Sequence, residues 1–173
     1  MNEIKELPNL GLAGDKFYSP QDTVGTWLDY SGDVMAIDPS GRGADETAYV
    51  LVKMLNGQLF ITDAGGVKGG YSAETLQALS VIAKRNKVNE IIVESNFGDG
   101  MFTELFKPVL YKVYDVTVNE VRHSKQKELR IIDTLEPVMN QHRLVIDPKV
   151  IEKDWQSVQN YSQEKAPKYT LVY

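Results

Sequence analysis

Hydrophobic residues along the chain fall into short runs bounded by glycine, asparagine and serine, and these runs predict five strands. Two of the runs, GDVMAID and VNEIIVES, are apolar almost throughout, as strands buried on both faces are. Asn56-Gly57 is a strong hairpin signal, so the strands on either side of it are expected to pair antiparallel. The segment GGVKGGY is interpreted as a loop. The predicted strands are residues 32–38, 47–55, 58–64, 88–95 and 115–121.

Apolar residues at helical spacing and helix-start signals predict four helices from residue 72 onward. Ser72, with the acid Glu74 behind it, marks the start of the first helix. Pro108 is expected to kink the second helix, and Pro137 to kink the third or end it early. Pro148 suits the first position of the fourth. The predicted helices are residues 72–87, 100–113, 125–142 and a segment from 148 onward.

The order of these elements predicts an α/β fold. Three antiparallel strands come first, and later strands are joined through helical crossovers, which gives a mixed sheet with helices on both faces. Residues 1–30 are broken by glycine and proline and are interpreted as an irregular N-terminal arm or linker. Residues 31–173 are expected to form one domain, because 173 residues suffice for a single core.

The amino-acid composition excludes several kinds of functional site. The chain has no cysteine, which excludes a disulfide framework, a thiol nucleophile and a zinc–thiolate site. No apolar run approaches the roughly 20 residues that span a bilayer, and the polar start is unlike a signal peptide, so no membrane is expected. The net charge is −5, whereas free-standing nucleic-acid binders are usually basic. A DNA-acting protein of this charge needs clustered basic residues or a tether to another DNA-binding part.

Two of the predicted strands end on acids, Asp38 and Glu94. If these strands are parallel neighbours, their carboxyl ends lie roughly 4.8 Å apart, so both side chains could bind one metal. Oxygen ligands without histidine or cysteine suit Mg²⁺ or Mn²⁺, and two such ions can act on a phosphodiester. The alternative is that each acid caps the following loop or pairs with a lysine.

Three segments around these acids, IDPSGRGADETAYV, GGVKGGY and EIIVESNFGDGMF, closely resemble the nuclease domain of phage large terminase subunits of the podovirus type. KELRIIDTLEPVMNQHRLVID also looks like that family's sequence after its fifth strand. The resemblance implies a ribonuclease-H-like fold and a metal-dependent endonuclease that cuts concatemeric double-stranded DNA during genome packaging. It implies that Asp38 and Glu94 are the catalytic and metal-binding acids, with two Mg²⁺ or Mn²⁺ ions in the complete site.

The resemblance also implies partners. The family's full-length subunit carries an ATPase domain before the nuclease, and this chain has no GxxxxGK[ST] motif, so it resembles the nuclease part alone. The ATPase domain, the small terminase subunit, the portal protein and double-stranded DNA are the expected partners, in the bacterial host cytoplasm. No other cofactor is expected.

The family's third metal-binding aspartate lies in an acid-rich segment near the end of the domain, and the chain stops at APKYTLVY before such a segment. The domain is therefore expected to be C-terminally truncated. Asp45, in the loop after Asp38, is the first choice for an auxiliary metal ligand. Asp63, Asp133 and Asp147 are weaker choices, and Asp147 is better explained as a helix N-cap.

Five basic residues are candidates for contacts with DNA phosphates. One stands between two glycines after Asp38, one lies in the GGVKGGY segment, and three cluster where the third helix starts, against the helix dipole. The alternative for each is an ordinary solvated side chain. The candidates are Arg42, Lys68, Lys125, Lys127 and Arg130.

Two other functions are weighed against the nuclease. The first is a non-catalytic remnant that folds and docks partners but lacks the third acid. The second is an actin-like ATP-binding domain, which has a related sheet but needs a second lobe that a chain of this length cannot supply.

Overall fold

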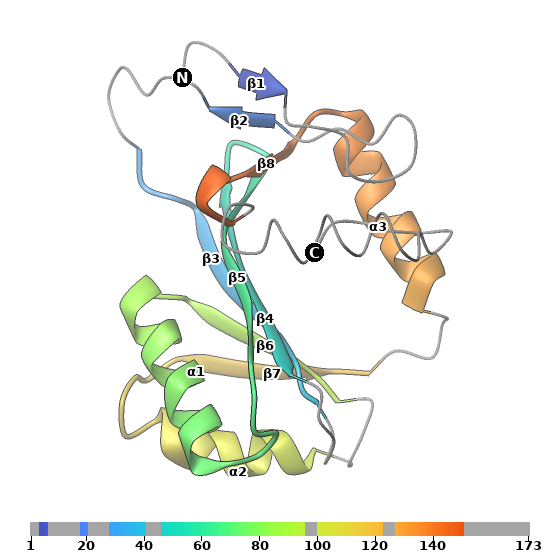
Figure 1. Ribbon diagram of the computed structural model, residues 1–173. Coiled ribbons are helices and arrows are strands. Elements are labelled where there is room, and N and C mark those ends of the chain that lie inside the picture. The colour runs from blue at the N-terminus through green and yellow to red at the C-terminus, as the bar shows by residue number, and fades with distance from the viewer. Residues whose placement is uncertain are drawn as a thin grey trace. The chain divides into compact units, whose positions relative to one another are not determined.

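The computed structural model describes residues 4–6, 18–20, 28–40, 46–95, 100–122 and 127–150, and for 4–6, 18–20 and 127–129 the backbone only. Within these residues it contains eight strands and three helices (Figure 1). The strands are β1 (Ile4–Glu6), β2 (Tyr18–Pro20), β3 (Gly32–Asp38), β4 (Thr47–Leu55), β5 (Gln58–Val67), β6 (Glu90–Glu94), β7 (Thr117–Val121) and β8 (Leu144–Ile146). The helices are α1 (Ala73–Asn86), α2 (Met101–Leu110) and α3 (Lys127–Asn140).

The strands form a mixed sheet in the order β1-β2-β8-β5-β4-β3-β6-β7. β1 and β2 pair antiparallel, whereas β3 with β6, β6 with β7, and β8 with both β2 and β5 pair parallel. The chain divides by its contacts into two compact units. The first contains residues 1–30, 54–63 and 125–173, and the second contains residues 31–53 and 64–124. The predicted α/β class and mixed sheet are confirmed.

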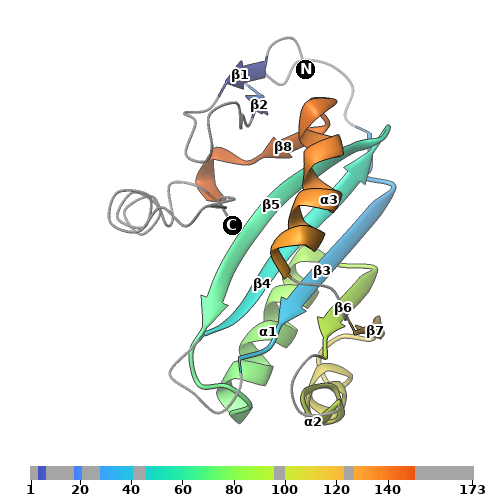
Figure 2. The same cartoon turned by 90° about the vertical axis from the view of Figure 1, so that its right-hand side faces the viewer.

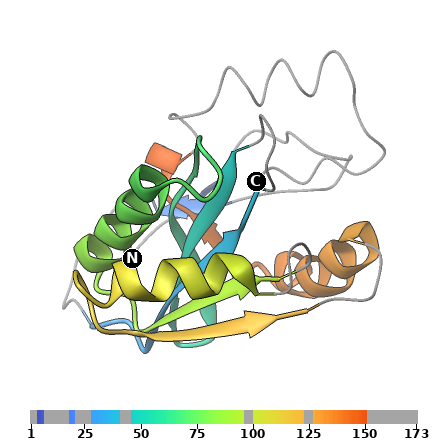
Figure 3. The same cartoon turned by 90° about the horizontal axis from the view of Figure 1, so that it is seen from below.

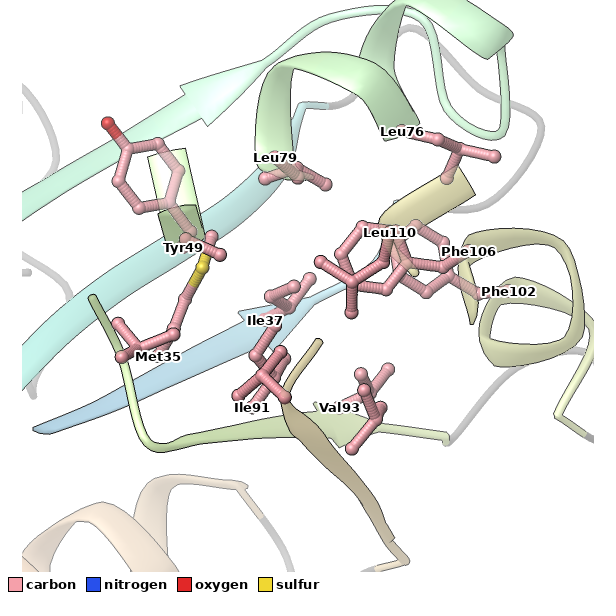
Figure 4. Packing of buried hydrophobic residues seen from close by; sticks show 14 of the residues in the cluster. Met35, Ile37, Tyr49, Leu76, Leu79, Ile91, Val93, Phe102, Phe106 and Leu110 are labelled. Carbon is pink, nitrogen blue, oxygen red and sulfur yellow. The ribbon is translucent and has the colours of Figure 1, made fainter. Parts of the chain in front are cut away.

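The second unit is built around one hydrophobic core. α1 and α2 pack against each other beside β6 and β7 (Figure 3). Alternate residues of the strands point into this core, where they meet the apolar stripes of both helices (Figure 4). Met35 and Ile91, from neighbouring strands, are both fully buried there. Phe102 and Phe106 supply the aromatic part of the core, with ring centroids 5.5 Å apart.

The β4–β5 hairpin forms as its turn residues predict. Asn56 and Gly57 have φ angles of 52° and 78°, so both central residues are left-handed, which is the signature of a type I′ turn. This turn twists in the same sense as the flanking strands, and therefore favours tight antiparallel pairing.

The ends of α1 follow from residues close to them in sequence. Ser72 Oγ accepts a hydrogen bond from the backbone N–H of Thr75 at 3.2 Å and so caps the first turn. Lys87 ends the helix in the left-handed region, and its N–H returns to carbonyls of the last turn. A hydrogen bond from its own backbone N–H, and a second from Ser72, hold the pKa of Glu74 below its usual value. This contribution to stability is present at neutral pH and is lost as the pH falls through that lowered pKa.

Replacing Ser72 with alanine should lower the free energy of unfolding by about 1 kcal/mol, because the first turn loses its side-chain acceptor. The same change should raise the pKa of Glu74 toward its usual value, which a carboxyl-carbon NMR titration measures. Ser72→Asn, which keeps an acceptor, is the matched control and should retain the stability. An unchanged Glu74 pKa in Ser72→Ala would contradict this account of the cap.

The first unit has a smaller core of its own. Leu144 and Ile146 of β8 are buried and pack with Val138 and Met139 of α3. Leu59 and Ile61 of β5, opposite Leu144 and Ile146 in the parallel register, also belong to the cluster, as does Val150. None of the described helices is long and apolar enough to cross a bilayer.

Four details of the sequence interpretation are wrong. Residues 4–6 and 18–20, expected to be irregular, form the paired strands β1 and β2. Residues 144–146, expected only to lead into a helix, form β8. The GGVKGGY segment is not all loop, because β5 continues through Val67. Of the two alternatives for Pro137, the early end of the helix is wrong, because α3 runs on to Asn140.

Candidate metal centre

The two acids singled out from the sequence are the last residues of neighbouring parallel strands. β3 pairs with β6 so that Val34 lies opposite Glu90 and Ile37 lies opposite Val93. One further step along this register brings Asp38 opposite Glu94. Figure 2 shows the arrowheads of β3 and β6 beside each other. The expectation that these strands are parallel neighbours is therefore confirmed.

Both acids also lie on one face of the sheet. Ile37 and Val93, which precede them, are 2% and 0% exposed and point into the core under α1 and α2. Because successive side chains in a strand point to opposite faces, Asp38 and Glu94 lie on the face away from that core. Each is half-buried. Neighbouring strands are about 4.8 Å apart, a spacing at which two side chains on the same face can bind a common cation.

A pair of buried hydroxyl groups follows the first acid. The backbone N–H of Ser40 donates to Thr47 Oγ1 at 3.2 Å, and the two side-chain oxygens are also 3.2 Å apart. Thr47 is the first residue of β4 and is fully buried, while Ser40 is 7% exposed. These bonds join the exit of β3 to the entry of β4.

The second acid is followed by another buried serine. The N–H of Ser95 donates to the carbonyl of Val121 at 3.0 Å, and its hydroxyl makes a longer contact of 3.4 Å with the same oxygen. Ser95 therefore holds the end of β6 against β7.

Lys68 lies immediately after β5 and forms a loose ion pair with Glu46, with 3.8 Å between Nζ and Oε1. The lysine side chain is 80% exposed. The Glu46 carboxylate lies close against Gly66, where a Cβ atom would collide with it. Since Glu46 directly precedes β4, this pair lies at the edge of the sheet where β3 ends.

Several sequence candidates lie outside the described residues or in the other compact unit. Lys127 is the first residue of α3, and its backbone alone is described, while Arg130 lies in the first turn of that helix. Asp147 caps the turn after β8 by accepting from the N–H of Lys149 at 3.0 Å, as expected of an N-cap. Asp63 and Asp133 belong to the first unit, whereas Asp38 and Glu94 belong to the second. Arg42, Asp45 and Lys125 lie outside the described residues.

Within the part of the chain that the structure describes, no group of three or more histidine or acidic side chains is arranged to hold a metal ion. The candidate centre there consists of two carboxylates, both supplied by strand ends. Their oxygen atoms are the hard donors that Mg²⁺ and Mn²⁺ prefer. The donor set therefore fits such an ion in kind, with two protein ligands.

Sequence reasoning missed Ser40 and Thr47 as supports of the site. A serine two residues after Asp38 and a β-branched residue at the start of the next strand are visible in IDPSGRGADET. Nothing in that pattern shows that the two hydroxyls meet, because the bond depends on the path of the chain between them.

A comparison with protein-family models matches residues 37–144 to the ribonuclease H-like domain of the bacteriophage T7 terminase. The chain belongs to this family. It is 44% identical over 172 residues to the large terminase subunit of Enterobacteria phage T3, and the match covers 99% of the chain but 29% of that relative. The chain thus spans less than a third of the relative's length.

Solved structures of terminase nuclease domains share the fold of this family member. The human cytomegalovirus domain, soaked with manganese and bound to an inhibitor, aligns with a TM-score of 0.52 at 11% identity, over 75% of this chain and 77% of that one. A mutant nuclease domain of the large terminase subunit of bacterial virus Sf6, with manganese and beta-thujaplicinol, aligns with a TM-score of 0.51 at 12% identity, over 76% and 72%. These similarities support the ribonuclease-H-like fold. They do not support the actin-like alternative.

Proposed function

We propose that this chain is the metal-dependent endonuclease domain of a phage large terminase subunit. The observation that carries the proposal is the adjacent placement of Asp38 and Glu94 at the ends of two parallel strands, on one face of the sheet. The similar solved structures are terminase nuclease domains, which supports hydrolysis of a DNA phosphodiester as the reaction class. The proposed substrate is concatemeric double-stranded DNA, cut during genome packaging.

Asp38 and Glu94 would hold a divalent ion, Mg²⁺ or Mn²⁺, with two ions in the complete site. Such ions, when bound, activate the attacking water and neutralise charge on the leaving oxygen. Manganese in two structurally similar domains supports this class of metal. Asp45 is proposed as an auxiliary ligand because it lies in the sequence between Asp38 and β4.

The chain's own residues have two further tasks in this proposal. The strands fix both carboxylates before DNA arrives, because their backbones are held in a parallel register. Lys68 would contact a DNA phosphate at the same edge of the sheet, where its exposed ammonium group is held only loosely by Glu46. Arg42, Lys125, Lys127 and Arg130 are proposed as further phosphate contacts.

The negative net charge of the chain indicates that other parts of the packaging machinery help it to bind DNA. A chain of charge −5 is poorly suited to capture DNA by itself, so we assign DNA delivery to the ATPase domain of the same subunit. The small terminase subunit and the portal protein are the other proposed partners. The proposed setting is the cytoplasm of the bacterial host.

Plasmid cleavage tests the proposal. The 173-residue chain, at micromolar concentration with Mn²⁺, should convert supercoiled plasmid to nicked and linear forms, and excess EDTA should stop the reaction. A C-terminally extended version of the chain, assayed in parallel, separates a weak isolated domain from an inactive fold. If neither version cuts DNA with Mn²⁺ or Mg²⁺, the endonuclease assignment is wrong.

A further inference from the structure

The backbone just beyond Asp38 is fixed by a side chain. Pro39 follows the acid and has no N–H, so the first backbone donor after Asp38 is the N–H of Ser40. This group donates to Thr47 Oγ1 at 3.2 Å. Both residues are buried, so water does not replace the bond when it is lost.

The exit of the other acidic strand is fixed differently. Beyond Glu94, the first backbone donor is Ser95, which bonds to the main-chain carbonyl of Val121 at 3.0 Å. Each acid is thus followed within two residues by a buried, hydrogen-bonded N–H. After Glu94 the acceptor is a backbone carbonyl, which no substitution removes. After Asp38 the acceptor is the side-chain hydroxyl of Thr47.

We propose that Thr47 is a positioning residue for Asp38, with Ser40 as its partner. This inference rests on the proposed function, in which Asp38 and Glu94 hold a divalent ion. A metal site binds well when its ligands are already aligned, and groups that orient the ligands affect affinity without touching the metal. Without the Thr47 hydroxyl, the buried N–H of Ser40 has lost its acceptor, which is unfavourable. The backbone that carries Asp38 then moves so that this N–H can find another partner.

Isothermal titration calorimetry of the 173-residue chain with MnCl₂ tests the role without relying on cleavage. Thr47→Val keeps the shape of the side chain and removes the hydroxyl, and should raise the dissociation constant for Mn²⁺ about tenfold. Thr47→Ser keeps the hydroxyl and should bind within about threefold of the unsubstituted chain. Asp38→Asn removes the ligand itself and should abolish Mn²⁺ binding, so this variant is the reference for complete loss of binding.

A matched control comes from α1. Ser80 is fully buried, and its hydroxyl donates to the carbonyl of Leu76 at 2.8 Å, away from both acids. Ser80→Ala should lower the melting temperature while leaving the Mn²⁺ dissociation constant unchanged. If Ser80→Ala weakens Mn²⁺ binding as much as Thr47→Val, the effect is general loosening and the positioning role is wrong.

The remaining outcomes separate this inference from the proposed function. Mn²⁺ binding that is lost in Asp38→Asn but unchanged in Thr47→Val overturns the positioning role and leaves the metal site standing. A chain that binds no Mn²⁺ before any substitution overturns both. Should Thr47→Val fail to fold, Thr47→Ala also removes the acceptor and takes its place, with about tenfold weaker binding expected. An unchanged Mn²⁺ dissociation constant in Thr47→Ala would then overturn the role.

Discussion

Replacing Asp38 with asparagine should abolish Mn²⁺-dependent plasmid cleavage while leaving the fold intact. The amide has nearly the same shape as the carboxylate, but it carries no charge and is a weaker ligand for a hard cation. Loss of groups that merely support a ligand already costs 10–100-fold in many metal sites, so loss of a ligand should exceed about a hundredfold. Glu94→Gln should have a comparable effect, because Glu94 is opposite Asp38 in the sheet register.

The rate of plasmid nicking at saturating Mn²⁺, together with the melting temperature in EDTA, measures the effect. Glu90→Gln is the matched control, since Glu90 lies on the same strand and the same face as Glu94, four positions earlier, and bonds to Asn119 at 2.7 Å. Its activity should stay within about twofold, as expected of a surface change away from the site. Cleavage that survives in both Asp38→Asn and Glu94→Gln would mean that the two carboxylates are not the catalytic acids.

Replacing Phe106 with alanine should have the largest effect on stability. Phe106 has no exposed surface, and its ring packs 5.5 Å from that of Phe102, which in turn lies 5.8 Å from Tyr71. Removing a buried aromatic ring costs about 3–5 kcal/mol, from lost apolar burial and from the cavity left behind. Since small domains have about 5–15 kcal/mol in total, the variant should be close to unfolding at 37 °C.

Urea unfolding followed by far-UV circular dichroism measures this loss. The neighbouring residue provides the control: Leu105 is 45% exposed on the outer side of the same helix, and Leu105→Ala should cost less than about 1 kcal/mol. Equal unfolding midpoints for the two variants would contradict the placement of Phe106 in the core.

Features that depend on a few adjacent residues could be predicted from the sequence. Asn56-Gly57 specifies its turn because both residues tolerate positive φ, and Ser72 specifies the start of α1 because its oxygen reaches an N–H three residues on. The placement of Asp38 and Glu94 could also be predicted from the sequence. Each closes an apolar run, and the helix between the runs favours parallel neighbours whose ends meet at one edge.

Features that depend on distant partners were missed. β8 has only three residues, too few to show a periodicity, and it is a strand because β5 and β2 flank it. β1 and β2 are equally short, and their paired residues stand 12–16 positions apart, with no short turn signal between them. The bond between Ser40 and Thr47 could not be predicted either, because a loop serine and a threonine at the start of a strand look ordinary until the strand ends are brought together.

The parallel pairing of β3 and β6 also dictates when the acids can meet. Val34 can meet its partner Glu90 only after the whole β4–β5 hairpin and α1 have been synthesised, and pairings between residues so far apart in sequence are slow to form. A nascent or partly folded chain therefore carries Asp38 and Glu94 apart. On the proposed function, the metal centre therefore cannot cleave chromosomal DNA until the domain has folded. The bound ion then stabilises the folded state by mass action.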